Sequence, residues 1–217
     1  MYTIIEDCSP YYIRFKFDKL ISIIGYLKSI RENVNGLTPT FKQYEFPHAY
    51  THRNLSKSEG NPLLQMLPLA QQLPLKRDRF AIFSTFPGGG CGIHKDADDH
   101  KVSINIPFMI MDDKCITSWY DEAEFKGLQA KDPQSQYTEG NGYTRSIFPD
   151  YKEMHKFTPI MTMTAKPNEA LLFNTDIYHS WDNTNSSYDR KVLTIRPLDT
   201  ANVDYNTVKQ ILMENKV

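Results

Sequence analysis

Apolar residues recur at helical spacing in two segments of the first third of the chain. In Phe17–Arg31 they fall three or four positions apart, at Leu20, Ile23, Ile24, Leu27 and Ile30. This spacing predicts an amphipathic helix. A second helix is predicted over Pro62–Leu73, with a kink at Pro68 because proline cannot donate a backbone hydrogen bond. The helical pattern stops there, so no later helix is expected.

From Arg79 onward the pattern changes to short apolar runs separated by Gly, Pro, Asn and Asp, which is typical of strands and turns. Strands are expected within Arg79–Phe86, Val102–Met111, Cys115–Tyr120, Ile160–Thr164, Glu169–Tyr178 and Arg190–Arg196. A long polar stretch, residues 121–159, interrupts them, and a loop of this length is usually functional or flexible.

These patterns predict a mainly β fold with N-terminal helices, in the sandwich or barrel class. The 217 residues suit a single domain. We expect a helical N-terminal support over residues 1–76 and a β core over residues 77–217, with an insertion near 121–159.

Composition and charge narrow the functional classes. Apolar residues make up 40% of the chain and charged residues 24%, which excludes wholesale disorder. The 25 basic and 26 acidic side chains give a formal net charge of −1. A protein that binds nucleic acid through a broad basic field is therefore disfavoured, and a small-molecule or peptide substrate is expected instead.

The cysteine spacing and the N-terminal residues indicate the cellular compartment. Cys8, Cys91 and Cys115 are widely spaced and form no CxxC pair, so a disulfide framework or a structural zinc site is not expected. The N-terminus carries Glu6 and Asp7 and has no long apolar stretch, unlike a signal peptide. Apolar runs stay well below 18 residues, so no membrane span is predicted. We expect a cytoplasmic protein.

Three separate pieces of the β region carry candidate chemistry. The first is His94-Lys95-Asp96, in which His94 and Asp96 share a face if the segment is extended, while Lys95 points away. The second is His179, near the end of the apolar run of residues 170–178. The third is Arg190, eleven residues later, an interval that allows a hairpin to bring it back beside His179.

Two histidines and one carboxylate on a β scaffold form the 2-His-1-carboxylate triad that binds iron(II) and leaves one side of the metal open. An arginine suits a carboxylate-bearing co-substrate, because the planar guanidinium pairs bidentately and keeps its charge.

At these residues the chain resembles the Fe(II)/2-oxoglutarate-dependent oxygenases, most closely the aspartyl/asparaginyl and prolyl hydroxylase-like branches. The resemblance covers Arg79–Pro197. It rests on His94, Asp96, His179 and Arg190, supported by the flanking segments SINIP (103–107) and KPNEALLFN (166–174).

The resemblance implies a double-stranded β-helix core, also called a jelly-roll or cupin-like core. His94, Asp96 and His179 would be the catalytic metal ligands for Fe(II). Arg190 would hold the distal carboxylate of the co-substrate 2-oxoglutarate. With O₂, and with ascorbate as a supporting reductant, the expected reaction hydroxylates an amino acid or a peptidyl side chain and releases succinate and CO₂.

Some assignments remain open in the sequence. Arg196 shares a strand face with Arg190, so either could bind 2-oxoglutarate, with Arg190 preferred. Ser84 is a second candidate for co-substrate binding, weighed against an ordinary strand serine. Asn105 shares the parity of Ser103 and Pro107, and we interpret it as a structural amide.

Two other functions fit the same residues. One is a non-redox cupin-like module that binds a metal or a small molecule, and the other is a nucleic-acid demethylase of the same superfamily. The sequence gives neither the substrate nor the oligomeric state.

Overall fold

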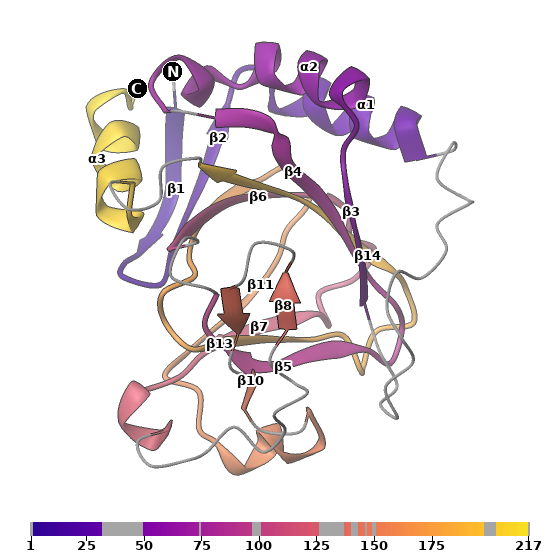
Figure 1. The fold of residues 1–217 in the computed structure, drawn as a ribbon, viewed down its shortest axis with the longest axis vertical. Helices are drawn as coiled ribbons and strands as arrows, with labels where there is room; N and C mark the ends of the chain where they lie inside the picture. The colour runs from indigo at the N-terminus through magenta and orange to yellow at the C-terminus, as the bar shows by residue number, and fades with distance from the viewer. Residues whose placement is uncertain are drawn as a thin grey trace.

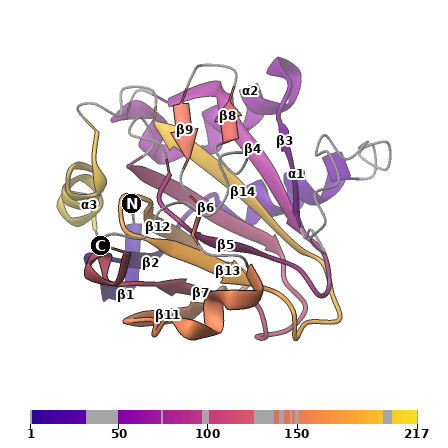
Figure 2. The same ribbon diagram turned by 60° about the horizontal axis from the view of Figure 1, so that its bottom comes forward.

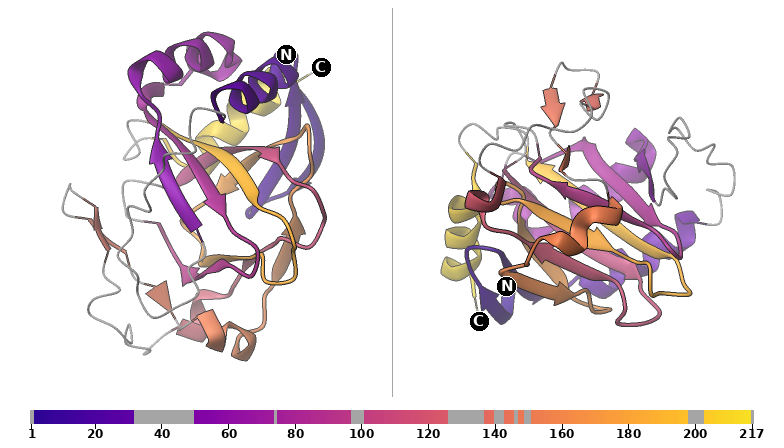
Figure 3. Two further views of the ribbon diagram at one scale, coloured as in Figure 1. Left: turned by 90° about the vertical axis from the view of Figure 1, so that its right-hand side faces the viewer. Right: turned by 90° about the horizontal axis from the view of Figure 1, so that it is seen from below.

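Two antiparallel sheets face each other in the computed structural model, and helices cover the far side of the larger one (Figure 1). The structure describes residues 2–31, 50–73, 75–96, 101–125, 137–139, 143–145, 147–148, 151–197 and 203–216. The two chain ends lie near each other beside α3 (Figure 3).

In the described part of the chain, seven strands form the larger sheet, in the order β1-β2-β12-β6-β14-β4-β3 with every neighbouring pair antiparallel. Their bounds are β1 Tyr2–Cys8, β2 Tyr12–Phe17, β3 Tyr50–Asn54, β4 Leu75–Thr85, β6 Val102–Met109, β12 Ala170–Asn174 and β14 Arg190–Pro197.

The second sheet has five strands among the described residues, in the order β10-β5-β13-β7-β11, again antiparallel throughout (Figure 2). Its bounds are β5 Gly90–His94, β7 Ile116–Trp119, β10 Ile147–Phe148, β11 Met161–Thr164 and β13 His179–Asp182. A separate pair, β8 Tyr137–Glu139 and β9 Tyr143–Arg145, completes the strands described.

The face of the seven-stranded sheet that meets the helices is apolar. Because strand residues alternate between faces, the intervening residues turn toward the other sheet. In β6, Val102, Ile104, Ile106 and Phe108 join the main core, whereas Ser103, Asn105 and Pro107 turn toward the other sheet. Three helices pack on or beside this sheet, α1 Leu20–Arg31, α2 Lys57–Met66 and α3 Tyr205–Glu214 (Figure 1).

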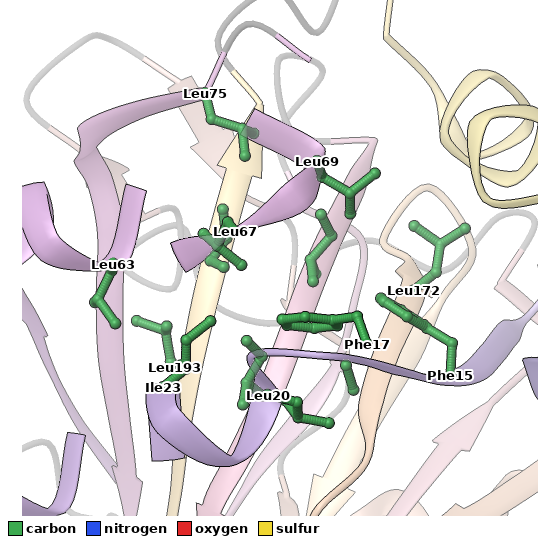
Figure 4. Packing of buried hydrophobic residues seen from close by; sticks show 14 of the residues in the cluster. Phe15, Phe17, Leu20, Ile23, Leu63, Leu67, Leu69, Leu75, Leu172 and Leu193 are labelled. Atoms are coloured by element: carbon green, nitrogen blue, oxygen red, sulfur yellow. The ribbon is translucent and has the colours of Figure 1, made fainter. Parts of the chain in front are cut away.

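The core between helices and sheet is built from leucines and aromatic residues (Figure 4). Leu20, Ile23 and Leu27 of α1 are fully or almost fully buried and lie at the predicted helical spacing. Burying one such side chain stabilises the fold by about 1.5–3 kcal/mol. This layer anchors the sheet on which half of the candidate site is built.

Helix α2 begins earlier than the sequence pattern predicts. Ser56 accepts a hydrogen bond from the backbone N–H of Glu59, and the Glu59 side chain accepts one from the N–H of Ser56, which is a capping box. The helix therefore starts at Lys57 and contains Pro62 in its interior. It ends at Met66, and the short 3₁₀ helix η2 Pro68–Gln71 follows the predicted break.

The expectation of one helix in 17–31 and of strands after residue 79 is confirmed, but several features differ. Strands β5 and β13 lie outside the expected strand ranges. The N-terminal part also contributes β1, β2 and β3 to the larger sheet. The strand over 75–85 is longer than expected, and α3 follows the β core although no late helix was expected. Helix α3 is capped by Asp204 and buries Tyr205, Val208 and Leu212, a short apolar stripe.

Two short helices and strand β10 of the predicted insertion lie against the five-stranded sheet. The 3₁₀ helices are η3 Glu122–Phe125 and η5 Tyr151–Lys156, and Phe125 packs with Phe157 and Ile93. Strand β10 pairs with β5 at His94 and Ile93. Residues 126–136, 140–142, 146 and 149–150 of the insertion lie outside the described residues. None of the helices described is both long and apolar enough to cross a membrane.

Candidate metal centre

His94 and His179 meet where β5 ends and β13 begins. They are direct partners in the antiparallel register, and their ring centroids are 4.3 Å apart. Both side chains are buried. Two neighbouring strands of one sheet therefore bring the two predicted imidazole ligands together.

A backbone carbonyl fixes the orientation of each ring. Nδ1 of His94 lies 2.7 Å from the carbonyl oxygen of Gly92, and Nδ1 of His179 lies 2.8 Å from that of Ile177. A carbonyl only accepts, so each Nδ1 donates its hydrogen, and in the neutral imidazole the lone pair is then on Nε2. This is the arrangement that orients histidines as metal ligands.

Asp96 completes the group two residues after His94. Its backbone N–H donates to the carbonyl of Thr175 at 3.1 Å, which holds the turn after β5 against the segment before β13. Asp96 Oδ1 lies 3.7 Å from His94 Nε2. One ligand atom from each of His94, Asp96 and His179 lies within 4.8 Å of the others, so the three residues could hold a metal ion.

The donor set fits Fe(II). Two neutral imidazoles and one carboxylate, all delivered from one side, match the facial triad, in which the other side of the metal stays open. The hydrogen bonds of both Nδ1 atoms to carbonyls supply the outer partners that such sites need.

Lys95, between the two ligands, turns away from this centre as expected. Its Nζ donates to Glu122 at 2.9 Å and lies 4.9 Å from the centroid of the Tyr178 ring. The ion pair joins β5 to the first described turn of the insertion.

Arg190 opens β14 in the opposite sheet and pairs directly with Thr85, the last residue of β4. Both side chains are buried. Among the described residues, neither Arg190 Nε nor Thr85 Oγ1 has a hydrogen-bond partner. Arg190 lies on the same face of β14 as Val192, and Thr85 on the same face of β4 as Phe83. The Phe83 ring meets Trp181 of the five-stranded sheet edge to face, with ring centroids 6.4 Å apart. Arg190 and Thr85 therefore point between the sheets.

The pKa of the Cys115 thiol responds to three charged groups, one of which is Arg190. Burial raises the pKa of the Cys115 thiol, the charge of Arg190 acts in the opposite direction, and Asp182 and Asp112 add to the increase. The Arg190 guanidinium and the two carboxylates therefore each lie within electrostatic range of the Cys115 thiol.

The structure separates the two arginines of β14. Arg196 lies near the metal centre, with one guanidinium nitrogen, Nη2, 3.5 Å from Asp96 Oδ2, and its guanidinium sits 5.9 Å from the Phe83 ring centroid. Arg190 lies six residues away, at the other end of the strand. The two do not compete for one position.

Ser84 is not brought to the site. It pairs with Lys191, and its parity is that of Ile82 and Phe80, which belong to the core under the helices. Alternation along the strand puts the neighbouring hydroxyl, Thr85, between the sheets instead. Sequence reasoning missed Thr85 because the exact register of β4 is not visible in the chain.

Aromatic residues form one wall of the space between the sheets. The Phe173 ring lies 5.0 Å from His179 and 4.9 Å from Trp119, and Trp119 stacks on Tyr12 at 5.4 Å. On the other side, Trp181 meets His94 edge to face at 5.6 Å. The sequence signal that places Trp181 here is its position two residues after His179.

Comparison with known proteins shows similarity in fold but not in sequence. The chain matches the structure of the non-heme α-ketoglutarate-dependent epimerase SnoN from nogalamycin biosynthesis with a TM-score of 0.54 and 9% identity, over 87% of this chain and 78% of that one. SnoN in complex with Fe³⁺, α-ketoglutarate and nogalamycin RO matches with a TM-score of 0.51 and 10% identity, over 85% and 78%.

The carbocyclase SnoK, also non-heme and α-ketoglutarate-dependent and from nogalamycin biosynthesis, gives a TM-score of 0.52 at 9% identity, over 87% of this chain and 79% of that one. At such identities the comparison establishes a shared fold. No protein-family model and no curated protein sequence matches the chain.

Proposed function

We propose that this protein is a non-haem Fe(II)- and 2-oxoglutarate-dependent dioxygenase that hydroxylates an amino acid or a peptidyl side chain. The observation that carries the proposal is the convergence of His94, Asp96 and His179, with both imidazoles oriented by carbonyls so that Nε2 is the metal-binding atom. Arg190 and Thr85 support it by adding an anion-binding pair on the facing sheet.

The strand order supports a double-stranded β-helix core. From β4 to β14 the chain crosses between the sheets, so that β4, β14, β6 and β12 are adjacent in one and β5, β13, β7 and β11 in the other. Proteins described as α-ketoglutarate-dependent share this fold at TM-scores above 0.5. We further propose that residues 77–217 form this core and that residues 1–76 support it.

Each group of the site has a distinct task. His94, Asp96 and His179 would hold Fe(II). When bound, Fe(II) with 2-oxoglutarate and O₂ supplies oxidative decarboxylation to succinate and CO₂, coupled to oxidation of a C–H bond. Arg190 and Thr85 would bind the distal carboxylate of 2-oxoglutarate, because a buried guanidinium and a buried hydroxyl donor both suit an anion.

The aromatic residues keep water away from this space. Phe173 covers one side of His179 and Trp181 contacts His94, so both imidazoles are shielded. Exclusion of water strengthens the ion pair between Arg190 and a carboxylate and protects a reactive oxidant from side reactions.

The reaction type and the branch are the finer parts of the proposal. Hydroxylation follows from the resemblance of HxD, SINIP and KPNEALLFN to the aspartyl/asparaginyl and prolyl hydroxylase-like branches. SnoN and SnoK are described as an epimerase and a carbocyclase, so this fold also serves other oxidations. The experiment therefore has to measure co-substrate turnover separately from hydroxylation.

Purified protein with Fe(II), ascorbate and O₂ should convert 2-oxoglutarate to succinate, slowly without substrate. Addition of amino acids and peptides should then identify those that raise the rate and gain 16 mass units. His179→Ala should abolish turnover, whereas Lys95→Met, which changes the neighbour of two ligands, should retain it. Absence of 2-oxoglutarate binding in an anaerobic titration would refute the proposal.

A further inference from the structure

We infer that Arg196 is a positioning residue that holds Asp96 in a one-oxygen binding mode and does not bind the co-substrate. The inference rests on the proposed function, because it assigns a role at the proposed metal centre. It separates Arg196 from Arg190, two residues that the sequence alone leaves as alternatives for the same carboxylate.

The two oxygens of Asp96 point in different directions. Oδ1 lies 3.7 Å from His94 Nε2, on the side where the three ligand atoms converge, and Oδ2 lies 3.5 Å from Arg196 Nη2. A carboxylate whose second oxygen is held by an arginine presents one oxygen to the metal. With two imidazoles this makes three protein donors.

The ion pair with Asp96 and the contact with the Phe83 ring hold the Arg196 side chain in place. The Asp96 side chain is 8% exposed and the Arg196 side chain 17%, so water screens the pair less than a surface ion pair. The guanidinium also lies over the Phe83 ring, at 5.9 Å from its centroid. Phe83 itself comes from β4, the strand that also carries Thr85.

The consequence concerns the number of open positions at the metal. Bidentate 2-oxoglutarate needs two positions and O₂ needs a third, so three protein donor atoms leave the required number on a six-coordinate ion. If Asp96 rotated and used both oxygens, one position would be lost. By occupying Oδ2, Arg196 prevents this rotation.

Co(II) substitution tests the inference before any co-substrate is added, because the visible bands of Co(II) report coordination number and geometry. Arg196→Met is expected to change the shape and intensity of these bands, and to weaken Co(II) binding about tenfold, the lower end of the range for a lost outer partner of a metal ligand. Subsequent 2-oxoglutarate binding should weaken as well. Arg190→Met is expected to weaken 2-oxoglutarate binding while the Co(II) spectrum stays as in the wild type.

Two further variants separate position from charge. Lys95→Met removes a positive charge next to both ligands but from a side chain that points away, and it should leave spectrum and affinity within twofold of the wild type. Arg196→Lys keeps the charge on a shorter side chain without a planar fork. It is expected to show the change of Arg196→Met to a smaller degree, and it carries the test if the Met variant does not fold.

A wild-type Co(II) spectrum in Arg196→Met or in Arg196→Lys would overturn the inference. So would a changed spectrum in Lys95→Met, because charge alone would then account for the effect. If the wild-type protein binds Co(II) and 2-oxoglutarate but Arg196→Met behaves like it, only this inference fails. If the wild-type protein binds neither, the proposed function fails.

Discussion

His94 and His179 are direct partners across β5 and β13, with ring centroids 4.3 Å apart and both Nδ1 atoms bonded to carbonyls. The backbone thus orients both imidazoles before any metal arrives. Metal can bind such a site in the folded protein but not in the unfolded chain, so metal binding should stabilise the fold.

At a free Co(II) concentration of 100 times the dissociation constant, we expect metal to add about 2.7 kcal/mol to the free energy of unfolding. Thermal unfolding with and without metal, and after chelator treatment, measures the shift. His94→Ala and His179→Ala should each remove most of it. A shift that persists in the double variant would place the metal elsewhere.

Thr85 and Ser84 are adjacent hydroxyls on opposite faces of β4. Thr85→Val removes a donor to the distal carboxylate at nearly constant volume. Because a hydrogen bond to a charged group contributes about 1.5–3 kcal/mol, 2-oxoglutarate affinity should fall about tenfold or more. Ser84→Ala is the matched control and should change affinity less than twofold in an anaerobic titration. The opposite ranking would return the role to Ser84.

The Glu59 carboxyl makes the free energy of unfolding depend on pH. Its hydrogen bond with Arg53, at 2.7 Å, is the main reason that the pKa of this carboxyl falls from 4.5 to about 2, helped by the Ser56 backbone and opposed by burial. Because the folded pKa is below the unfolded one, the stabilisation is complete above about pH 4.5 and is lost as the pH falls toward 2.

Glu59→Gln should cost about 1 kcal/mol at pH 7, because the amide oxygen can still accept from the Ser56 N–H but the charge that pairs with Arg53 is lost. The difference from the wild type should shrink as the pH falls below 4.5. Urea unfolding at pH 7 and pH 3 measures both values. Asp113→Asn, at an exposed position, is the control. A difference that is independent of pH would show that the Glu59 charge is not what stabilises α2.

Trp119 is fully buried and stacks between Tyr12 and Phe173, which in turn contacts His179. Trp119→Ala should lower the free energy of unfolding by about 3–5 kcal/mol, because it leaves a large cavity. Ile160→Ala, at an exposed position beside the same sheet, should stay within about 0.5 kcal/mol. Urea unfolding compares them, and equal losses would contradict the packing role of the indole.

The sequence indicates the site residues better than the details that surround them. His94 and Asp96 are identifiable from their HxD spacing, and His179 from its place at the end of an apolar run. Thr85 is not identifiable from the sequence, because which hydroxyl of β4 faces the other sheet depends on the register of β4, which its pairing with β14 sets. Whether Arg190 or Arg196 meets Asp96 depends on the distance between two sheets, which no local pattern contains.

The same reasons apply to the fold. Helix α1 has a long apolar stripe and is predicted from the sequence, whereas α3 buries three residues in one short segment and is not. Strand β2, YIRFKF, was not predicted, and it carries Arg14 at a buried position where the guanidinium pairs with Glu6 and Glu169. An internal ion pair of this kind hides a strand from a pattern based on hydrophobicity.

The proposed metal ligands and the proposed anion-binding pair belong to different sheets: His94 and His179 to the five-stranded one, Arg190 and Thr85 to the seven-stranded one. A co-substrate that chelates the metal and reaches Arg190 would therefore cross-link the two sheets. While bound it would oppose relative movement of the sheets, and its conversion to succinate would remove the cross-link once in every catalytic cycle.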